Sequence, residues 1–305
     1  ENYQEDLRIS ENILKQLVDT YRRIRNTCRF ILGNISDFNP DIEAVAVKDM
    51  LPLDRYALSL INSRHHAIQK AYSAYEYHKV FHTLHNICVT DLSAFYLDVL
   101  KDRLYVYAPK STKRLSAQTA LWHILLILIR DMAPILSFTA EEAYQHLPEA
   151  MKENVSSIFE LQLPETAEEI LSTEEKELWS VLTQVRSEVT KAIEPVRKSG
   201  VVGHSLDTHI CLYCPTGIYS KLHQLENSLR EIFIVSDVSL GDESKAPEDC
   251  FKSEEIKGLK ISVEHAKGEK CERCWTYSQD LNKTEPYAMA CPRCQKVLQE
   301  LEDIS

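Results

Sequence analysis

Residues 13–33 read ILKQLVDTYRRIRNTCRFILG, and this stretch decides the fold class that the sequence predicts. Its apolar side chains recur at steps of three and four residues, at Ile13, Leu14, Leu17, Val18, Tyr21, Ile24, Cys28, Ile31 and Leu32. That spacing places them along one side of an α-helix, and such a stripe must be buried against other helices. Gly33 stands where the residue that follows a helix is expected. We therefore predict a long helix that ends at Leu32 and belongs to a helical bundle.

The remainder of the first half continues this periodicity. Further helices are predicted over residues 54–72, 77–88, 91–100 and 116–134, with a short one from residue 139. The residues expected to begin them are Asp54, Asp91, Ser116 and Thr139. Thr139 opens a Thr-x-x-Glu capping box. Together these segments suit an antiparallel helical bundle.

The second half is typical of a small α/β unit. Residues 158–163 alternate weakly, and the Glu-rich segment 165–177 is expected to be a solvated linker. The elements predicted after it are a helix at 178–193 ended by Ser199-Gly200, strands at 208–213, 232–240 and 259–263, and a helix at 216–229. The predicted fold is therefore mainly α, with a helical bundle at 1–163, an α/β junction unit at 164–264 and a C-terminal module at 265–305.

Residues 270–297 read KCERCWTYSQDLNKTEPYAMACPRCQKV. Two Cys-x-x-Cys pairs, Cys271/Cys274 and Cys291/Cys294, are separated by 16 residues. Four thiolates at this spacing satisfy tetrahedral zinc, and the polar residues between them would depend on the metal for their folding energy. The alternatives are two redox pairs or unrelated thiols. We predict a knuckle with one structural zinc ion.

Basic and aromatic residues flank the knuckle. They are Arg273, Trp275, Arg293 and Lys296. An aromatic ring among cations suits stacking on an unpaired base together with phosphate contact. The alternative is a tryptophan packed on a neighbouring domain beside solvated cations, and the local sequence favours neither.

Two further basic groups are candidates for phosphate contact. The first is the predicted N-terminal helix, with Arg22, Arg23, Arg25 and Arg29, and the second is a segment with Lys110, Lys113 and Arg114. A plain solvated helix face explains the arginines equally well. The chain has a formal net charge of −11, but residues 141–177 alone contribute −9, from eleven Glu and two Lys. Local basic patches on an acidic protein still attract a polyanion, because screening confines each charge to about 8–10 Å.

Other patterns exclude functions. The nine scattered cysteines do not form a secreted disulfide framework, so a reducing compartment is expected. The pair Cys211/Cys214 falls in a strand, where such positions point to opposite faces, and is not expected to bind metal. His78, His82 and His85 share a helix face but show no matching further ligand, so packing or a polar stripe is predicted. The sequence carries no membrane-spanning run, phosphate loop, dinucleotide fingerprint or recognisable catalytic set.

Several stretches together resemble the C-terminal part of bacterial-type or organellar isoleucyl-tRNA synthetases. They are residues 3–10, 21–34, 91–98, 101–105, 116–119, 133–142 and Cys271-Glu-Arg-Cys-Trp275. The helical stretches are shared in outline with valyl and leucyl enzymes, whereas Cys-x-x-Cys-Trp after a small α/β unit is more specific to the isoleucyl type. The second pair, Cys291-Pro-Arg-Cys-Gln295, is also similar to the finger of formamidopyrimidine-type DNA glycosylases. Those enzymes use an N-terminal proline and a basic body, which this chain does not offer.

The resemblance implies an anticodon-binding bundle, a junction and a zinc module, without the catalytic or editing domains. The family's His-x-Gly-His and Lys-Met-Ser-Lys-Ser motifs do not occur, and Lys110-Ser-Thr-Lys-Arg114 is only a superficial echo of the latter. The chain begins with Glu1, so we expect a fragment of a longer protein. The parent would join isoleucine to its tRNA with ATP and Mg(II), while this part alone would be inactive.

The implied partner is the isoleucine tRNA, with no DNA and no membrane, in a cytoplasmic monomer. The resemblance also favours RNA contact by the arginine helix, the basic segment, Arg273 and Trp275. Three other interpretations stay open. They are the matching region of a valyl or leucyl enzyme, a stand-alone RNA-binding or regulatory module, and a DNA-repair finger.

Overall fold

The computed structural model describes residues 3–4, 6, 9–163, 169–283 and 285–303. The chain divides into two compact units. Among the described residues, the first extends to Leu104 and resumes from Pro109 to Leu171, and the second comprises Tyr105–Ala108 and the residues from Ser172 onward. The predicted boundary between residues 163 and 164 falls at 164–168, outside the described residues, as does most of the Glu-rich linker's first half. The division into three domains stays a prediction.

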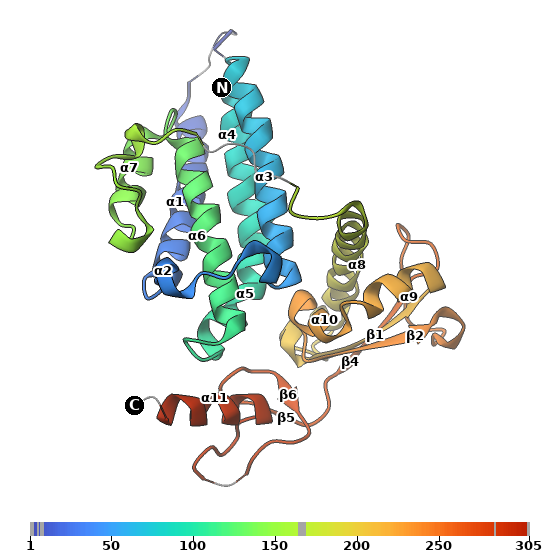
Figure 1. Ribbon diagram of the computed structural model, residues 1–305. Helices are drawn as coiled ribbons and strands as arrows, with labels where there is room; N and C mark the ends of the chain where they lie inside the picture. The colour runs from blue at the N-terminus through green and yellow to red at the C-terminus, as the bar shows by residue number, and fades with distance from the viewer. Residues whose placement is uncertain (1–2, 5, 7–8, 164–168, 284, 304–305) are drawn as a thin grey trace. The chain divides into compact units, whose positions relative to one another are not determined.

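The first unit is a helical bundle, so the predicted fold class is confirmed (Figure 1). Its helices are α1 (Glu11–Ile35), α2 (Pro40–Glu43), α3 (Pro52–Ser73), α4 (Tyr77–Asn86), the π-helix η2 (Ile87–Tyr96), α5 (Leu97–Val106), α6 (Thr112–Met132) and α7 (Ser137–Gln145). Helix α6 packs against α1, α3, α4 and α7 and is the centre of the core. Its Leu121, Ile124 and Leu125 are completely buried, because neighbouring helices cover it on several sides.

Two residues predicted to cap helices are instead buried inside them. Asp54 lies in the first turn of α3, which begins at Pro52, and Ser116 lies inside α6, whose cap is Ser111. Both side chains are fully buried, and the Ser116 hydroxyl donates a hydrogen bond to Asp54 Oδ2 at 2.5 Å. The prediction was wrong because Asp and Ser are common caps, and a sequence does not show when their polar atoms have partners on another helix.

Three other predicted helix boundaries are also wrong. Helix α1 continues through Gly33, which has no positive φ and does not end it. Asp91 does not begin a helix but lies within η2, where it accepts two hydrogen bonds from Arg64. Thr139 lies inside α7 and shares a hydrogen bond of 3.0 Å with Tyr21. For Asp91 and Thr139, an interaction between helices, rather than a local cap, explains the residue.

The second unit contains a four-stranded sheet with helices on one face (Figure 1). Its elements are α8 (Thr173–Lys198), β1 (Thr208–Cys214), α9 (Thr216–His223), α10 (Glu226–Phe233), β2 (Asp237–Asp242), β3 (Phe251–Lys252) and β4 (Lys260–His265). The strand order is β2-β1-β4-β3, with β1 and β2 parallel and the other pairs antiparallel. Strand β1 alternates between buried and half-buried residues, so one face of the sheet carries the core and the other is more open.

The sequence predicted most of this unit but misplaced two elements. The break at Ser199-Gly200 is confirmed, since α8 ends there and Gly200 has a φ of 80°. The helix predicted at 216–229 is two helices, α9 and α10. The strand predicted at 232–240 starts only at Asp237, because Ile232 belongs to α10 and Ile234 ends that helix in a left-handed conformation.

The last elements surround the four cysteines. They are β5 (Glu269–Lys270), β6 (Tyr277–Ser278) and α11 (Pro292–Glu302), and β5 pairs with β6 in an antiparallel hairpin. Short 3₁₀ helices occur at Val47–Asp49, Glu149–Met151, Ile158–Glu160, Ser205–Asp207 and Glu243–Lys245. The third of these replaces the weakly alternating segment predicted near residue 158. In the described parts of the chain, no helix combines the length and apolar character needed to cross a bilayer.

Candidate metal centre and nucleic-acid interface

The four knuckle cysteines converge on one point. Their Sγ atoms all lie within 4.8 Å of one another, and the four side chains are buried. The first pair sits in a turn that the Trp275 amide closes by donating to the Cys271 carbonyl at 2.9 Å. The second pair opens α11, where Cys291 is the cap and Pro292 occupies the first turn. A turn and a helix start thus present two thiols each to the same volume.

The spacing of the sulfurs fits a four-coordinate metal. A tetrahedral ion with metal–sulfur bonds near 2.3 Å requires sulfur–sulfur distances of about 3.8 Å. The Sγ atoms of Cys274 and Cys291 are 3.7 Å apart. The Cys291 amide also donates to Cys271 Sγ at 3.3 Å, a contact that stabilises negative charge on a thiolate. The donor set therefore fits zinc, which prefers soft thiolate ligands in this geometry.

The pKa shifts of the cysteines also favour a bound cation. Hydrogen bonds from Cys291 and from Cys294 lower the pKa of the Cys274 thiol. The reciprocal interaction with Cys274 raises the pKa of Cys294. One thiolate is thus stabilised by its protonated neighbours, and further ionisation is opposed by like charge. A bound divalent cation removes this opposition and allows all four thiols to ionise.

Little else forms a core around the cysteines. The buried cluster contains the four cysteines, Val106 and Ala290, with Leu281, Tyr287 and Leu298 packed against it. Val106 and Ala290 add only a small apolar volume, so the four cysteines make up most of the buried cluster. The metal ligands therefore stand where a conventional domain would have its aliphatic core.

The basic residues around the knuckle fall into two groups. Arg273 donates to the carbonyl of Val106, and Arg293 lies over the Tyr107 ring at 5.0 Å and donates to its hydroxyl at 3.3 Å. Both arginines are thus engaged with the segment Tyr105–Ala108, which belongs to the same unit. Trp275 and Lys296, in contrast, are exposed.

Trp275 has an unusual backbone conformation. Its φ is 64°, in the left-handed region that costs an L-residue roughly 1–2 kcal/mol. Its side chain is also 62% exposed, although tryptophan is usually well buried. The ring is therefore available for contact outside its own unit, with a neighbouring domain or with RNA, so both interpretations considered from the sequence stay predictions.

The arginines of α1 also differ from one another. Arg22 pairs with Asp19, and Arg25 pairs with Glu142 at 2.7 Å. Arg23 and Arg29 are exposed, and neither has an acidic partner within ion-pair distance in the described part of the chain. Among the arginines of α1, these two are the ones that an external anion can reach without breaking an ion pair in the described part of the chain.

The basic segment before α6 is engaged within the bundle. Lys110 pairs with Glu43, and Arg114 makes a two-pronged ion pair with Asp37 through nitrogen–oxygen distances of 2.8 and 3.2 Å. Lys113 is half-buried in the first turn of α6, and it has contacts of its own. Charge alone, read from the sequence, did not reveal that these cations have internal partners.

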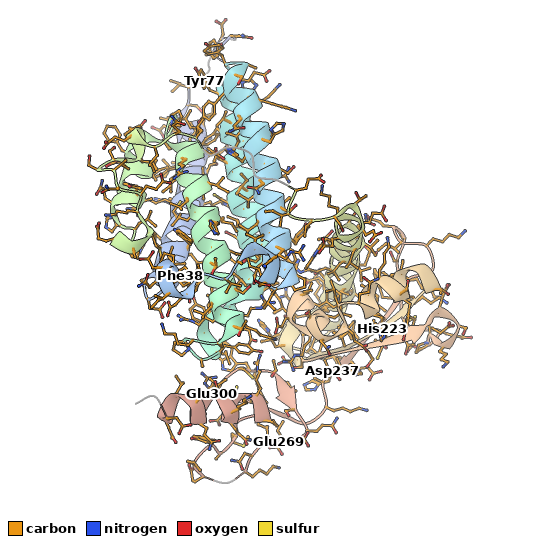
Figure 2. The ribbon with its side chains drawn as sticks, in the orientation of Figure 1. Phe38, Tyr77, His223, Asp237, Glu269 and Glu300 are labelled. Carbon is orange, nitrogen blue, oxygen red and sulfur yellow. The ribbon has the colours of Figure 1, made fainter. Side chains whose placement is uncertain are left out.

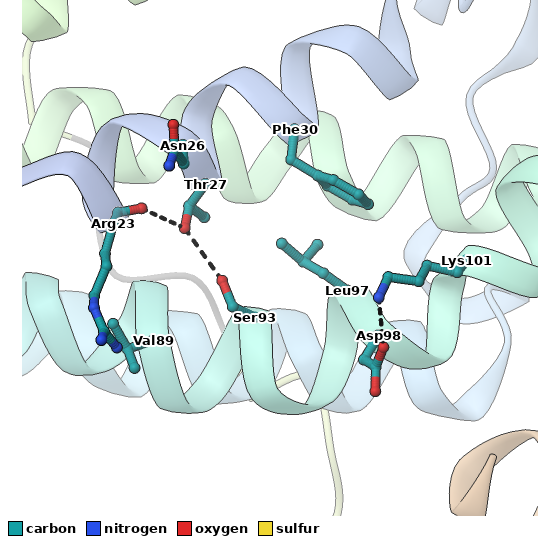
Figure 3. A pocket seen from close by; sticks show the side chains of 9 residues that line it. All are labelled: Arg23, Asn26, Thr27, Phe30, Val89, Ser93, Leu97, Asp98 and Lys101. Carbon is teal, nitrogen blue, oxygen red and sulfur yellow. Dashed lines mark hydrogen bonds and ion pairs between the residues drawn. The ribbon is translucent and has the colours of Figure 1, made fainter. Parts of the chain in front are cut away.

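A groove lies beside Arg23, between α1 and the run formed by η2 and α5 (Figure 3). It encloses about 340 Å³. Its lining residues are Arg23, Asn26, Thr27, Phe30, Val89, Ser93, Leu97, Asp98 and Lys101. Thr27 and Ser93 share a hydrogen bond across its floor at 3.3 Å, and Lys101 is held by Asp98 at 2.7 Å. Phe30 and Lys101 were not among the predicted contacts, because they are far apart in sequence and only the bundle brings them together.

Two weaker sequence patterns are resolved by the structure. Cys214 is buried on the helix-covered face of β1 and Cys211 lies on the other face, so this pair does not converge, as predicted. His78, His82 and His85 form no cluster of metal-binding atoms; among the described residues, the knuckle cysteines are the group whose donor atoms converge. His78 and His85 are half-buried and His82 is exposed.

Two family models match the chain. Residues 54–212, just over half of it, match the anticodon-binding domain of tRNA ligase. Residues 268–297 match the zinc finger found in FPG and IleRS, which spans the four cysteines. The first match covers most of the bundle and reaches into the second unit's sheet.

Relatives are similar over nearly the whole chain. An isoleucine–tRNA ligase of Nitratidesulfovibrio vulgaris (strain Miyazaki F) is 56% identical over 297 residues, which cover 97% of this chain and 32% of the relative. One from Lawsonia intracellularis is 50% identical over 302 residues, or 99% of this chain and 32% of the relative. One from Desulforamulus reducens is 42% identical over 299 residues, which cover 98% of this chain and 32% of the relative. The chain thus spans about a third of the length of these relatives.

Proposed function

Because the chain belongs to the family of anticodon-binding domains of tRNA ligases, we propose that it holds the anticodon arm of an isoleucine tRNA. The observation that carries this proposal is the joint match of the bundle to that family and of the whole chain to isoleucine–tRNA ligases. In the parent enzyme, isoleucine would be joined to tRNA with ATP and Mg(II) by a domain outside this sequence. The chain alone would position RNA without catalysing the ligation.

The knuckle would be a structural zinc site. Cys271, Cys274, Cys291 and Cys294 would ligate one zinc ion, which supplies four strong bonds in place of an aliphatic core. No coordination position is left for a substrate, so the ion would shape the knuckle without taking part in chemistry. The zinc-finger family match supports this assignment.

Two surfaces would contact the RNA. On the knuckle, Trp275 offers an exposed ring for stacking on an unpaired base, with Lys296 available for phosphate. On α1, Arg23 and Arg29 are exposed cations that form no ion pair with any described residue. We rank these four residues above the other predicted contacts. Arg22, Arg25, Lys110 and Arg114 would each have to exchange an ion pair for a phosphate, and Arg273 and Arg293 already bind the segment Tyr105–Ala108.

The remaining properties follow from the same proposal. The chain would act as a monomer in the cytoplasm, with tRNA as its nucleic-acid partner rather than DNA or a membrane surface. Its net charge of −11 is compatible with RNA binding because the acidic residues concentrate at 141–177. Binding would depend on local cations and would weaken with salt as counterions are released.

A gel-shift panel with isoleucine, valine and unrelated tRNAs tests the proposal. We expect the isoleucine tRNA to bind tightest and its affinity to fall as salt rises. Arg23→Ala should reduce the slope of log affinity against log salt by about 1, as loss of one phosphate contact requires. Arg22→Ala is the matched control, because Arg22 is already paired with Asp19 and should change the slope less. Equal binding of all three tRNAs, or binding that salt does not affect, would refute the proposal.

A further inference from the structure

The more open face of the second unit's sheet carries a cluster that the proposed function does not use. His209 and Cys211 lie two residues apart on β1, so they project from the same face. In the strand register, His209 pairs with Asp237 of β2 on one side and with Glu264 of β4 on the other. Three neighbouring strands thus place an imidazole, a thiol and two carboxylates on one face, more widely spaced than the knuckle sulfurs, which among the described residues are the group whose donor atoms all lie within 4.8 Å of one another.

The two donors on β1 have the separation that a bound metal requires. His209 Nε2 and Cys211 Sγ are 3.6 Å apart. A tetrahedral zinc ion with bonds of about 2.3 Å to sulfur and 2.05 Å to nitrogen places these atoms about 3.6 Å apart. The His209 side chain is only 15% exposed, and the Ser239 hydroxyl lies 2.8 Å from the same Nε2, so a bound ion would replace that hydrogen bond. Two donor atoms therefore already have the separation that one ion requires.

The charge around the imidazole also favours a cation. The Asp237 carboxylate lies 3.8 Å from Nε2, and the Glu264 carboxylate lies 4.0 Å from Nδ1. Neither carboxylate has a Lys or Arg within ion-pair distance in the described part of the chain; both approach His209 instead. Burial, followed by these two carboxylates, raises the pKa of the Cys211 thiol. The thiol is thus not a reactive thiolate, and the face has more negative than positive charge around its soft donors.

We propose that this face holds a second site for a thiophilic divalent cation of the zinc class, bound by His209 Nε2, Cys211 Sγ and the Asp237 carboxylate. Asp237 is 67% exposed, and its Oδ1 accepts a hydrogen bond from the Val238 amide at 2.9 Å, so the carboxylate would turn from that amide to reach the ion. Glu264 would accept a hydrogen bond from Nδ1–H and hold the ring in the tautomer that leaves Nε2 unprotonated. Water would fill the fourth position. Binding would displace the Cys211 thiol proton to solvent, so each ion bound releases one proton.

This site is distinct from the knuckle. It has one thiolate rather than four, and an exposed carboxylate rather than a closed ligand set, so we expect weaker zinc binding that exchanges with solvent. The site does not depend on the proposed RNA function, since none of its residues is among the proposed RNA contacts. Asp237 and His223, the latter being the control residue below, are labelled in Figure 2.

Zinc titration of the full chain, with the knuckle already loaded, tests the proposal. We expect a second equivalent of zinc in the wild type, with affinity at least tenfold lower in His209→Ala and in Cys211→Ser. His223→Ala is the matched control, because His223 also has a carboxylate neighbour, Glu226 at 2.8 Å, but in the described part of the chain it makes no hydrogen bond with a thiol. That variant should bind the second zinc unchanged. Retention of the first zinc and of helical circular dichroism in every variant shows that folding is intact.

A measurement on the wild type alone supports the titration. Zinc at the second equivalent should slow alkylation of Cys211 by iodoacetamide at least fivefold, measured by peptide mass spectrometry, while leaving Cys250 unaffected. A wild type that accepts only the knuckle zinc would overturn the proposal. So would an unchanged second affinity in both His209→Ala and Cys211→Ser, which would assign that ion to adventitious surface sites.

Discussion

In the bundle, Ile24, Leu84 and Leu125 are completely buried by helices from distant parts of the sequence, whereas the knuckle buries little beyond its four cysteines. The bundle gains stability from apolar area removed from water, at about 25 cal/mol per Å². The knuckle has few such groups, so its order must come from bonds to a metal. The two regions should therefore respond differently to the same kind of perturbation, and each prediction below tests that difference.

The largest effect should follow loss of a zinc ligand. Cys294→Ser removes one of four thiolates, and zinc-finger peptides gain about 10–16 kcal/mol of apparent binding energy from their metal. We expect loss of zinc and loss of amide protection from hydrogen exchange across residues 269–297, while α6 stays protected. Cys250→Ser, outside the cluster, is the control. Protection of the knuckle that survives the loss of zinc would show that it has a core of its own.

The bundle should be most sensitive at its buried ion pair. Asp54 Oδ2 lies 3.2 Å from the guanidinium of Arg103, and both side chains are at most 3% exposed. Asp54→Ala leaves that cation buried without its partner, which costs about 3–5 kcal/mol. Denaturant unfolding should show this loss in the helical signal, with one zinc still bound per chain. A loss below 1 kcal/mol would mean that water or another acid reaches Arg103.

Asp54 also shows what the sequence does and does not predict. The helices were predictable because α1 repeats its apolar residues at helical spacing, and the knuckle because the spacing of its cysteines matches the needs of one ion. Asp54 and Ser116 were misread as caps, because the same side chains serve as caps at the surface and as hydrogen-bond partners in a core. Which role they take is decided by Tyr96, whose hydroxyl donates to Asp54 from 42 residues away, and by Arg103.

The residues of the candidate site also differ in whether the sequence alone could identify them. The four cysteines could be found from sequence, because their function depends on local spacing. The ranking of the basic residues could not, because Arg25 and Arg114 have Glu142 and Asp37 as ion-pair partners, whereas Arg23 pairs with no acid among the described residues. Those acids lie 117 and 77 residues away in the chain. A pairing at that distance depends on tertiary structure, and no local pattern reports it.

Trp275 allows the metal and RNA roles of the knuckle to be separated. Trp275→Gly relieves a left-handed conformation, so zinc affinity should rise by about 1 kcal/mol, roughly fivefold. Trp275→Ala keeps the conformational cost and should leave zinc affinity near the wild-type value. Both variants should weaken tRNA binding by about 1–3 kcal/mol, the contribution of one stacked base. Zinc competition and gel shift measure the two effects. If tRNA affinity is unchanged in both, Trp275 is not an RNA contact.

The smallest effect should come from a surface ion pair of the bundle, and it should depend on pH. Partial burial raises the pKa of Asp37, but hydrogen bonds from Arg114 and Gln118 outweigh it, so the net pKa is below the ordinary 3.8. The folded state therefore binds this proton less tightly than the unfolded state, and the carboxylate stabilises the bundle above pH 3.8. Asp37→Asn should cost about 0.2–1 kcal/mol at pH 7. The difference in unfolding free energy between this variant and wild type should narrow as the pH falls from 5 to 3, whereas the knuckle's zinc content at pH 7 should not change.

Asp98→Asn is the control, because it removes only the carboxylate charge beside Lys101. It should cost less than Asp37→Asn at pH 7. A difference between wild type and Asp37→Asn that stays constant down to pH 3 would assign the effect to the lost amide and guanidinium geometry rather than to the charge.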